Sequence, residues 1–269
     1  MQIHDDINTN NLLTALIIPF YNEVNRFDFD DLDELARNSM DLLHIYLVDD
    51  GSTDELPKLI ERFVSKSNNK NIFLLSTREN LGKANAIRYG FNKIPNLQNR
   101  YKFIGFTDAD FSSPPSEIIR LAELNIKQKQ DIVAGVRIST GQNNVRTTRY
   151  RYLQGKLFSF LVLTILGGKF LDSQCGLKFM KISRETISVF ENNFMNDWLI
   201  DLEILCRLKK LQKVEIVEVV LREWIHKENS KTSFRDLPRV LKSLFKLRNE
   251  YGNLSDVTFD ASHRNQQGF

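Results

Sequence analysis

Strand-like and helix-like segments alternate through the first half of this chain, and no other feature of the sequence limits its fold as strongly. Apolar runs of strand length, rich in aromatic and β-branched residues, occupy residues 12–19, 45–48, 71–76, 103–107 and 131–137. Segments with apolar residues at helical spacing separate these runs. Because strands that alternate with helices form βαβ units, we expect an α/β fold with a mostly parallel central sheet flanked by helices.

The second half of the chain is less regular. It offers helices at 152–166, 198–211 and 238–247, and strands at 173–180 and 214–221. We expect a single domain over residues 1–248, in which residues 12–137 form a nucleotide-binding half. The other half, 138–248, serves a different task and ends in a basic helix. The polar segment 249–269 is predicted to be a disordered tail.

Composition constrains the partners and the cellular compartment of the protein more than it constrains its activity. The 269 residues carry a net charge of +3, which is too mild to indicate a nucleic-acid partner. Cys175 and Cys206 set no disulfide framework and suit a reducing compartment. Residues 1–10 are too polar for a secretory signal, and no run approaches the roughly 20 apolar residues that span a bilayer. We therefore expect a cytoplasmic protein.

Two carboxylates close the apolar run that begins at Phe103. Asp108 and Asp110 end this run with one small residue between them, and the following Pro114–Pro115 pair cannot continue a central strand. They therefore stand at the carboxyl end of a strand, where open α/β sheets bind ligands. Residues i and i+2 of an extended chain point to one side, so Mg²⁺ or Mn²⁺ would relieve the repulsion and bind a substrate phosphate. Alternatively, the two residues are exposed loop acids.

Four short motifs follow one another along the first half: Pro19–Glu23, Val48–Ser52, Asn80–Lys83 and Asp108–Asp110. In this order and at these spacings they resemble the GT-A fold of glycosyltransferase family 2, and the resemblance covers roughly residues 12–235. In the second half, residues 172–178 and 197–203 are similar to the dolichyl-phosphate glucosyltransferase branch, with the dolichyl-phosphate mannose synthases as close relatives. The resemblance implies an enzyme that transfers a sugar from a nucleotide donor with inversion.

The resemblance assigns most of the site residues to the sugar donor. The donor-binding residues that it implies are Pro19, Tyr21, Glu23, Val48, Asp50, Lys83, Asp108, Ala109, Arg137 and Lys231. Asp108 and Asp110 would hold the metal, and Asp110 would contribute to catalysis. Lys83 would meet a phosphate or a sugar hydroxyl, unless it is a solvated surface lysine, and Arg137 offers a guanidinium fork to the diphosphate. Lys231 matches a Ser-Lys element that closes over the phosphates in relatives, although the glycine common there is absent.

Asp201 is the catalytic residue that the resemblance implies for the second half. In the family an acid on this segment is the usual candidate for the general base, which a hydroxyl acceptor needs. A lipid phosphate is already ionised, so Asp201 would then orient the acceptor or bind sugar hydroxyls. Residues i and i+2 of a helix lie about 200° apart, so we place Glu203 behind Asp201 rather than in the cleft. His226 is a further candidate metal ligand, although a lone histidine is more often not one.

The identity of the two substrates is the least constrained part of the prediction. The leading hypothesis is transfer of a hexose from a UDP-glucose-like donor, or from GDP-mannose, to a polyprenyl or dolichyl phosphate. The alternative is transfer to a glycan hydroxyl in surface polysaccharide synthesis. A lipid acceptor implies a peripheral position on the cytoplasmic membrane face, for which the apolar helix 157–166 and the basic segment 222–248 offer surfaces. Core packing and a solvated basic face are the alternatives for these segments. A nucleic-acid partner is disfavoured because no aromatic stacking platform accompanies the basic segment, and the oligomeric state is open.

Overall fold

An eight-stranded sheet runs through the part of the chain that the computed structural model describes, residues 13–67, 69–128, 130–146, 149–225, 227, 237–255 and 257–260. Its strand order is β10-β8-β5-β7-β4-β1-β2-β3. The strands are β1 (Thr14–Phe20), β2 (Leu43–Asp49), β3 (Ile72–Ser76), β4 (Phe103–Phe106), β5 (Ile132–Val136), β7 (Lys178–Lys181), β8 (Glu215–Val220) and β10 (Thr258–Asp260). Two short strands, β6 (Asn144–Arg146) and β9 (Glu223–Ile225), pair with each other.

Neighbouring strands of the large sheet run parallel except at β7. This strand lies between β4 and β5 and is antiparallel to both, whereas the other pairs are parallel. The mostly parallel α/β sheet predicted from the sequence is therefore confirmed. Because β7 runs backwards, its first residue, Lys178, pairs with Phe106 of β4 and Ala134 of β5. The start of β7 thus lies at the edge where the parallel strands end.

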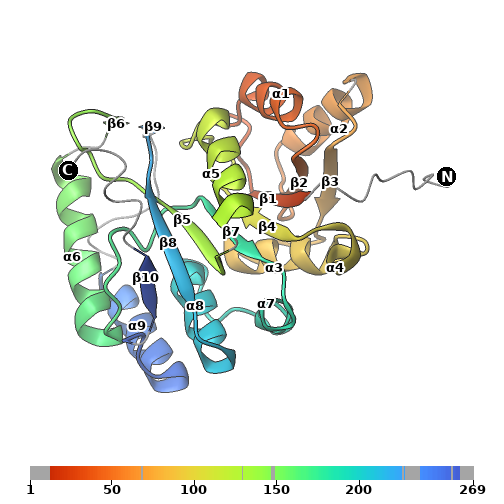
Figure 1. Cartoon of the computed structure of the whole chain (residues 1–269). Coiled ribbons are helices and arrows are strands. Elements are labelled where there is room, and N and C mark those ends of the chain that lie inside the picture. Colours follow the sequence, from red (N-terminus) through yellow and green to blue (C-terminus); the bar gives the residue numbers. More distant parts are fainter. Residues whose placement is uncertain are drawn as a thin grey trace.

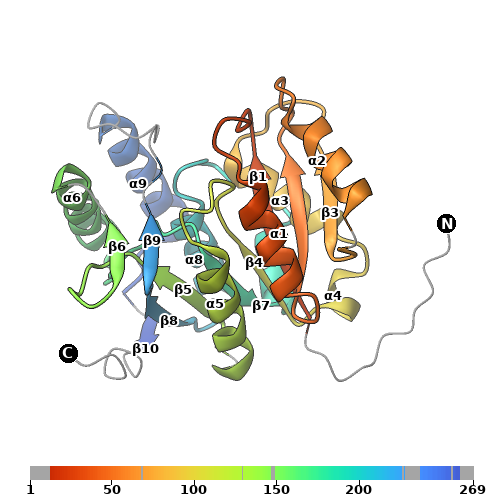
Figure 2. The same cartoon turned by 90° about the horizontal axis from the view of Figure 1, so that it is seen from above.

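Helices cover both faces of the sheet (Figure 1). One face carries α1 (Phe29–Asn38), α2 (Leu56–Lys66) and α5 (Pro115–Gln128). The other carries α3 (Lys83–Lys93), α4 (Leu97–Arg100), α7 (Arg184–Val189), α8 (Ile200–Leu211) and α9 (Leu237–Tyr251), with α6 (Arg149–Leu166) packed against α9 (Figure 2). Each face has its own apolar core. Because both faces are covered, β1 and β5 are buried along their whole length and are nearly continuous apolar runs.

Helix α1 is shorter than the residues 28–43 that helical spacing allows. Asp28 caps its start by accepting the N–H groups of Asp30 and Asp31. The helix ends at Asn38, because the N–H groups of residues 42 and 43 both bond to the Ser39 carbonyl and turn the chain into β2. Ser39 also donates its hydroxyl to the carbonyl of residue 35 at 2.6 Å, which satisfies a carbonyl group at the end of the helix.

The C-terminal segment contributes more to the fold than its polar composition indicates. Helix α9 continues to Tyr251, past the boundary expected at residue 248, and β10 pairs with β8 at the edge of the sheet. Leu254 and Val257 between them are buried, and the N–H of Leu254 bonds to the carbonyl of Leu166 in α6 at 2.6 Å. Residue 256 and residues 261–269 of the segment predicted to be disordered lie outside the described residues.

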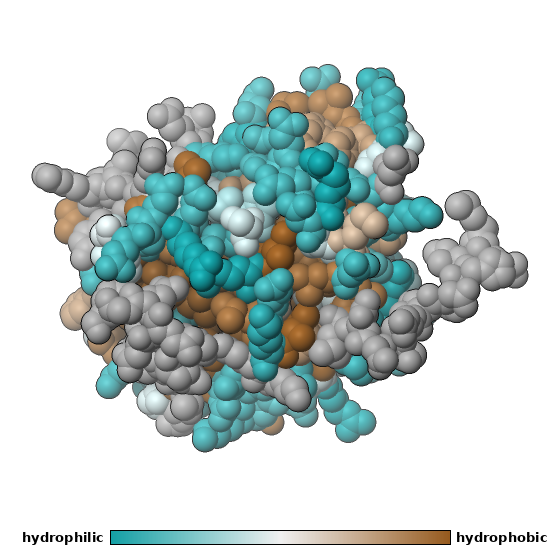
Figure 3. All heavy atoms as spheres, turned by 45° about the horizontal axis from the view of Figure 1, so that its top comes forward, coloured by the Kyte–Doolittle hydropathy of each residue, from teal (hydrophilic) through white to brown (hydrophobic). Residues whose placement is uncertain are grey.

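Helix α6 buries one side and exposes another. Val162 and Leu166 are fully buried, whereas Leu153, Phe160 and Leu163 are 62%, 61% and 44% exposed. Of the helices in the described parts of the chain, none combines the length and the apolar content that crossing a bilayer requires. The face of the molecule in Figure 3 is largely hydrophilic, with apolar residues visible between hydrophilic ones near its centre.

Candidate active site

Asp108 and Asp110 lie in the turn after β4, at the edge of the sheet where the neighbouring β1 also ends. Each carboxylate has a cationic partner from the first half of the chain. Lys83 donates its Nζ to Asp108 Oδ1, and the NH2 group of Arg26 lies 2.5 Å from Asp110 Oδ2. Asp110 Oδ1 also accepts the N–H of Ser112 at 3.0 Å. One side chain from the turn after β1 and one from the start of α3 therefore balance the acidic pair that the sequence predicts.

Arg26 is a site residue that sequence analysis missed. Its NH1 group also lies 3.0 Å from Glu23 Oε2, so the predicted donor-binding residue Glu23 is linked to Asp110 through Arg26. The N–H groups of Arg26 and Phe27 both bond to the Glu23 carbonyl and form the turn that brings the guanidinium to the site. This turn follows β1 with no periodic pattern, so nothing in the sequence indicated where Arg26 would point.

Lys83 is held at the site by the start of α3. Asp50 accepts two N–H groups of the preceding turn, at 2.8 and 2.9 Å. Gly82 has a φ of +83°, and a side chain there would lie 2.2 Å from Asp197 Oδ1, so only glycine fits. Asp197 in turn accepts the N–H of Ala84. Because Asp50 and Asp197 occupy these N–H groups, the start of α3 offers the Lys83 ammonium to the site and no free main-chain N–H groups from this turn.

The charges around Asp108 shift the pKa values of both partners. Burial alone would lower the pKa of the Lys83 ammonium, but Asp108 and Asp201 outweigh this effect and raise the pKa. Burial likewise would raise the pKa of Asp108, but Lys83, Arg137 and Lys178 hold it below its usual range. The pair is therefore ionised at neutral pH. Its side chains still keep 40% and 45% of their surface exposed, so a ligand can reach both.

Arg137 is held by a carboxylate of the second half. Its Nε and NH2 groups donate to the two oxygens of Asp172 at 2.7 and 2.9 Å, and its guanidinium lies over the ring of Trp224, 5.4 Å from the centroid. Burial would lower the pKa of Arg137, but Asp172 outweighs it and raises the pKa. The fork expected to bind a diphosphate is thus directed at Asp172, while its charge still acts on Asp108.

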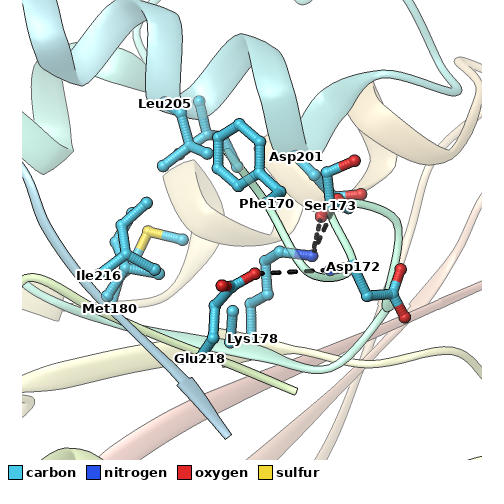
Figure 4. Close-up of a pocket in the computed structure, with 12 residues that line it drawn as sticks. Phe170, Asp172, Ser173, Lys178, Met180, Asp201, Leu205, Ile216 and Glu218 are labelled. Carbon is cyan, nitrogen blue, oxygen red and sulfur yellow. Dashed lines mark hydrogen bonds and ion pairs between the residues drawn. The ribbon is translucent and has the colours of Figure 1, made fainter. Parts of the chain in front are cut away.

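The predicted catalytic residue Asp201 lies beside a small cavity in the second half (Figure 4). It stands in the first turn of α8, and its Oδ1 is 2.9 Å from the Nζ of Lys178. The cavity has a volume of about 20 Å³. Its polar wall consists of Asp172, Ser173, Lys178, Asp201 and Glu218, and its apolar wall includes Phe170, Met180, Leu205 and Ile216. The side chains of Lys178 and Asp201 are only 7% and 10% exposed.

Glu203 points away from this group, as its place on the helix predicts. It is fully buried and accepts the N–H of Met195 at 3.0 Å. Its Oε1 also accepts a hydrogen bond of 2.7 Å from Arg207. The two acids of the segment therefore have different tasks: Glu203 holds the fold together, and Asp201 faces Lys178.

The surroundings of Asp108 suit a divalent cation. A side chain at position 176 would lie 2.2 Å from Asp108 Oδ2, so Gly176 keeps the space beside that carboxylate open. Within the described ranges, no group of three or more His, Cys, Asp or Glu side chains forms a complete metal site. The protein itself would thus supply only part of a metal shell. Asp108 and Asp110 offer two hard oxygen ligands, and a phosphate and water would complete the shell that Mg²⁺ or Mn²⁺ prefers. His226 lies outside the described residues.

Comparison with known sequences decides the family. Residues 15–183 match the sequence model described as Glycosyl transferase family 2. The chain belongs to glycosyl transferase family 2. It is 29% identical over 256 residues to a dolichyl-phosphate beta-glucosyltransferase of Dictyostelium discoideum, a match that covers 90% of this chain and 75% of the relative. A human dolichyl-phosphate beta-glucosyltransferase is 26% identical over 231 residues, which covers 81% of this chain and 68% of that protein.

Solved structures share the fold of this glycosyltransferase. Glucosyl-3-phosphoglycerate synthase from Mycobacterium tuberculosis, in complex with Mn²⁺, UDP and glucosyl-3-phosphoglycerate, matches it with a TM-score of 0.61 at 15% identity. The match covers 90% of this chain and 80% of that chain. The likeness confirms the GT-A fold predicted from the four motifs.

The remaining predicted donor-binding residues of the glycosyltransferase differ in how far a ligand can reach them. Tyr21 is partly exposed in the loop after β1. The side chains of Pro19, Val48 and Ala109 are buried, so they shape the site from beneath and offer no side-chain polar group to a donor. Lys231 lies outside the described residues.

Proposed function

We propose that this glycosyltransferase moves a hexose, with inversion, from a nucleoside-diphosphate sugar to a polyprenyl phosphate in a reaction that needs Mg²⁺ or Mn²⁺. The observation that carries the proposal is the acidic pair at the end of β4. Asp108 and Asp110 are ion-paired with Lys83 and Arg26, and the Lys83–Asp108 pair stays accessible. Because the Lys83–Asp108 pair is accessible, Lys83 can leave its carboxylate for a metal-bound diphosphate without leaving buried charge uncompensated.

A divalent cation at Asp108 and Asp110 would supply positive charge to the leaving diphosphate. The residues of the chain would do the rest of the work. Lys83 and Arg26, released from the two carboxylates, can each turn toward a phosphate oxygen. Asp50 and Asp197 keep the start of α3 in place while Lys83 moves, because they bond to main-chain N–H groups rather than to the lysine.

The donor and acceptor follow from the relatives and from the chemistry of Asp201. A UDP-glucose-like donor is favoured over GDP-mannose, because curated relatives over most of the chain are glucosyltransferases and the similar fold from Mycobacterium tuberculosis was solved with UDP. A polyprenyl phosphate is already ionised and can attack the sugar carbon directly as the bond to the diphosphate breaks. Asp201 would then orient the acceptor. With a glycan hydroxyl, the alternative acceptor, it would have to remove the proton.

A lipid acceptor would bring the protein to a membrane surface. The exposed apolar side chains of α6 (Leu153, Phe160 and Leu163) offer a place for this contact, and Phe245 of the neighbouring α9 is 55% exposed. We expect Phe160→Ser to weaken sedimentation with vesicles of anionic lipid while calorimetric binding of UDP in Mn²⁺ stays unchanged. Equal sedimentation of the variant and the wild type would remove α6 from the proposed membrane contact.

The decisive experiment measures donor binding and transfer separately. Calorimetry compares UDP, GDP, UDP-glucose and GDP-mannose with and without Mn²⁺, and transfer of labelled glucose to dolichyl phosphate is followed in detergent. Asp108→Ala should abolish the metal-dependent binding, whereas Asp41→Ala, at an exposed position before β2, should leave it unchanged. The configuration of the product tests inversion. If no nucleotide binds under any metal condition, the proposal is wrong.

A further inference from the structure

Lys178 is a buried cation that the proposed reaction does not use. It opens β7, in the middle of the sheet, and is 6% exposed. Its ammonium lies 2.9 Å from Asp201 Oδ1 and donates to the carbonyl oxygens of Ser173 and Cys175. Three protein oxygens therefore surround the ammonium, one of them in an ion pair and two as hydrogen-bond acceptors. Lys178 therefore acts on other groups of the protein rather than on a ligand.

The two carbonyl groups belong to the loop that packs against Asp108. This loop, residues 172–177, leads into β7 and includes Gly176, where a side chain would lie 2.2 Å from Asp108 Oδ2. At its start, Asp172 holds Arg137 through hydrogen bonds of 2.7 and 2.9 Å. One ammonium thus fixes a loop that contacts both Asp108 and Arg137.

The carboxylate partner comes from a different element. Asp201 stands on α8, which packs on one face of the sheet, and Figure 4 shows its side chain converging with Ser173 on Lys178. Against the opposing effect of burial, Asp201 also helps to raise the pKa of Lys83, so it is near the Lys83–Asp108 pair as well. Lys178 accordingly stands between the group that faces the donor and the acid expected to face the acceptor.

We propose that Lys178 is a positioning residue, which sets the place of Asp201 relative to Asp108 by tying α8 to the 172–177 loop. This inference rests on the proposed function, in which Asp108 serves the donor and Asp201 the acceptor. Without the ammonium, the Asp201 carboxylate is left charged and buried beside an apolar wall, and it must turn toward solvent. The groups that would bind the nucleotide, Asp108 and Lys83, keep each other as partners and stay in place.

A double-mutant cycle tests this coupling. The variants are Lys178→Met, Asp201→Asn and the double variant, with Lys181→Met as the control because Lys181 is the exposed residue at the other end of β7. For each variant, kcat and KM for transfer to dolichyl phosphate are measured together with the calorimetric affinity for UDP in Mn²⁺. Thermal unfolding is recorded in parallel. The double variant removes both charges of the buried pair, so it folds more readily than Lys178→Met alone.

The expected result is a loss in turnover that depends on Asp201. Lys178→Met should lower kcat by about tenfold or more with UDP affinity changed less than about threefold, and it should have no further effect when Asp201 is already Asn. Lys181→Met should behave as the wild type. Independent, multiplicative losses in the double variant would overturn the proposal, and so would an unchanged kcat in Lys178→Met or a UDP affinity that falls in step with kcat.

The outcome can be told apart from a failure of the proposed function. If the wild type binds no nucleotide and transfers no sugar, the proposed function is wrong and the kinetic cycle cannot support Lys178. If the wild type binds and transfers but the cycle is additive, only the role of Lys178 is wrong. Should Lys178→Met fail to fold, the comparison of the double variant with Asp201→Asn still decides, because equal kcat values are expected and a further loss would contradict the proposal.

Discussion

The site contains two lysine–aspartate pairs that are alike in chemistry and opposite in exposure. In the pair Lys83–Asp108 the side chains are 40% and 45% exposed. In the pair Lys178–Asp201 they are 7% and 10% exposed. An exposed pair adds little to stability and can exchange its partners with water, ions or ligands. A buried pair adds little either when intact, but losing one partner leaves a charge that the interior cannot solvate.

This difference in exposure indicates which pair can take part in ligand binding and which pair is fixed. Lys83 can leave Asp108 for a phosphate, since solvent or a metal compensates both charges during the exchange. Lys178 cannot leave Asp201 without stranding it, and two main-chain carbonyl groups hold the ammonium from the other side. We therefore regard the first pair as the movable part of the site and the second as its frame.

The strongest way to break this comparison is to remove the lysine of the buried pair. Lys178→Met should lower the free energy of unfolding by about 3–5 kcal/mol, because the carboxylate of Asp201 stays behind without a partner. Urea unfolding followed by circular dichroism measures the change. Lys181→Met on the same strand should alter it by less than about 0.5 kcal/mol. A loss below about 1 kcal/mol for Lys178→Met would mean that the buried pair is not a frame.

The two pairs are best compared above pH 7, because a partly buried histidine elsewhere, His44, adds a pH dependence of its own to stability. His44 bonds to the hydroxyl of Tyr101 at 2.7 Å, and burial, followed by Arg100, lowers its pKa to about 4. In the unfolded chain His44 therefore binds a proton near pH 6.5, whereas in the folded chain it stays neutral at that pH. Stability should be complete above pH 6.5 and fall by up to about 3 kcal/mol toward pH 4.

Unfolding midpoints in urea between pH 4 and pH 8 measure this dependence. His44→Gln, which can still meet Tyr101 but does not titrate, is the matched control and should flatten the curve in this range. If the wild type and His44→Gln lose stability equally between pH 6.5 and pH 4, His44 is not the cause.

Gly176→Ala should separate binding from stability at the exposed pair. The added carbon would lie 2.2 Å from Asp108 Oδ2, at the end of a half-exposed side chain that can swing aside. The free energy of unfolding should therefore change by less than about 1 kcal/mol, while affinity for UDP in Mn²⁺ falls by about tenfold, or 1.4 kcal/mol. Calorimetry and urea unfolding on the same sample decide this. A large loss of stability with unchanged affinity would be the reverse of what we expect.

The smallest expected effect on stability is that of Lys83→Met. An exposed ion pair contributes about 0–1 kcal/mol, so the unfolding free energy should drop by no more than that. Affinity for UDP should nevertheless fall, since the cation that we propose to meet the diphosphate is gone. A stability loss as large as that of Lys178→Met would erase the distinction between the two pairs.

The sequence indicated both residues of the exposed pair, Lys83 and Asp108, as site residues, but of the buried pair it indicated only Asp201. Asp108 and Lys83 stand in short motifs at strand and helix boundaries, where the local pattern already indicates a loop at the sheet edge. Lys178 stands inside the strand predicted at 173–180, and nothing near it in the sequence reveals that β7 runs backwards. Only this reversal brings its first residue beside the last residue of β4 and the middle of β5. Arg26 escaped notice for a related reason, because its direction depends on a non-repeating turn.

The reversed strand β7 also determines when the central sheet can be completed during folding. In the sheet order, β7 alone joins β4 to β5 among the described strands, so the two groups of parallel strands have no main-chain hydrogen bonds to each other without it. During synthesis, β5 (residues 132–136) leaves the ribosome well before β7 (residues 178–181). The two strands can therefore pair only after the later residues have emerged. We therefore expect that residues 12–137 do not fold as a unit on their own. A chain cut after residue 137 would leave β4 and β5 with open, aggregation-prone edges.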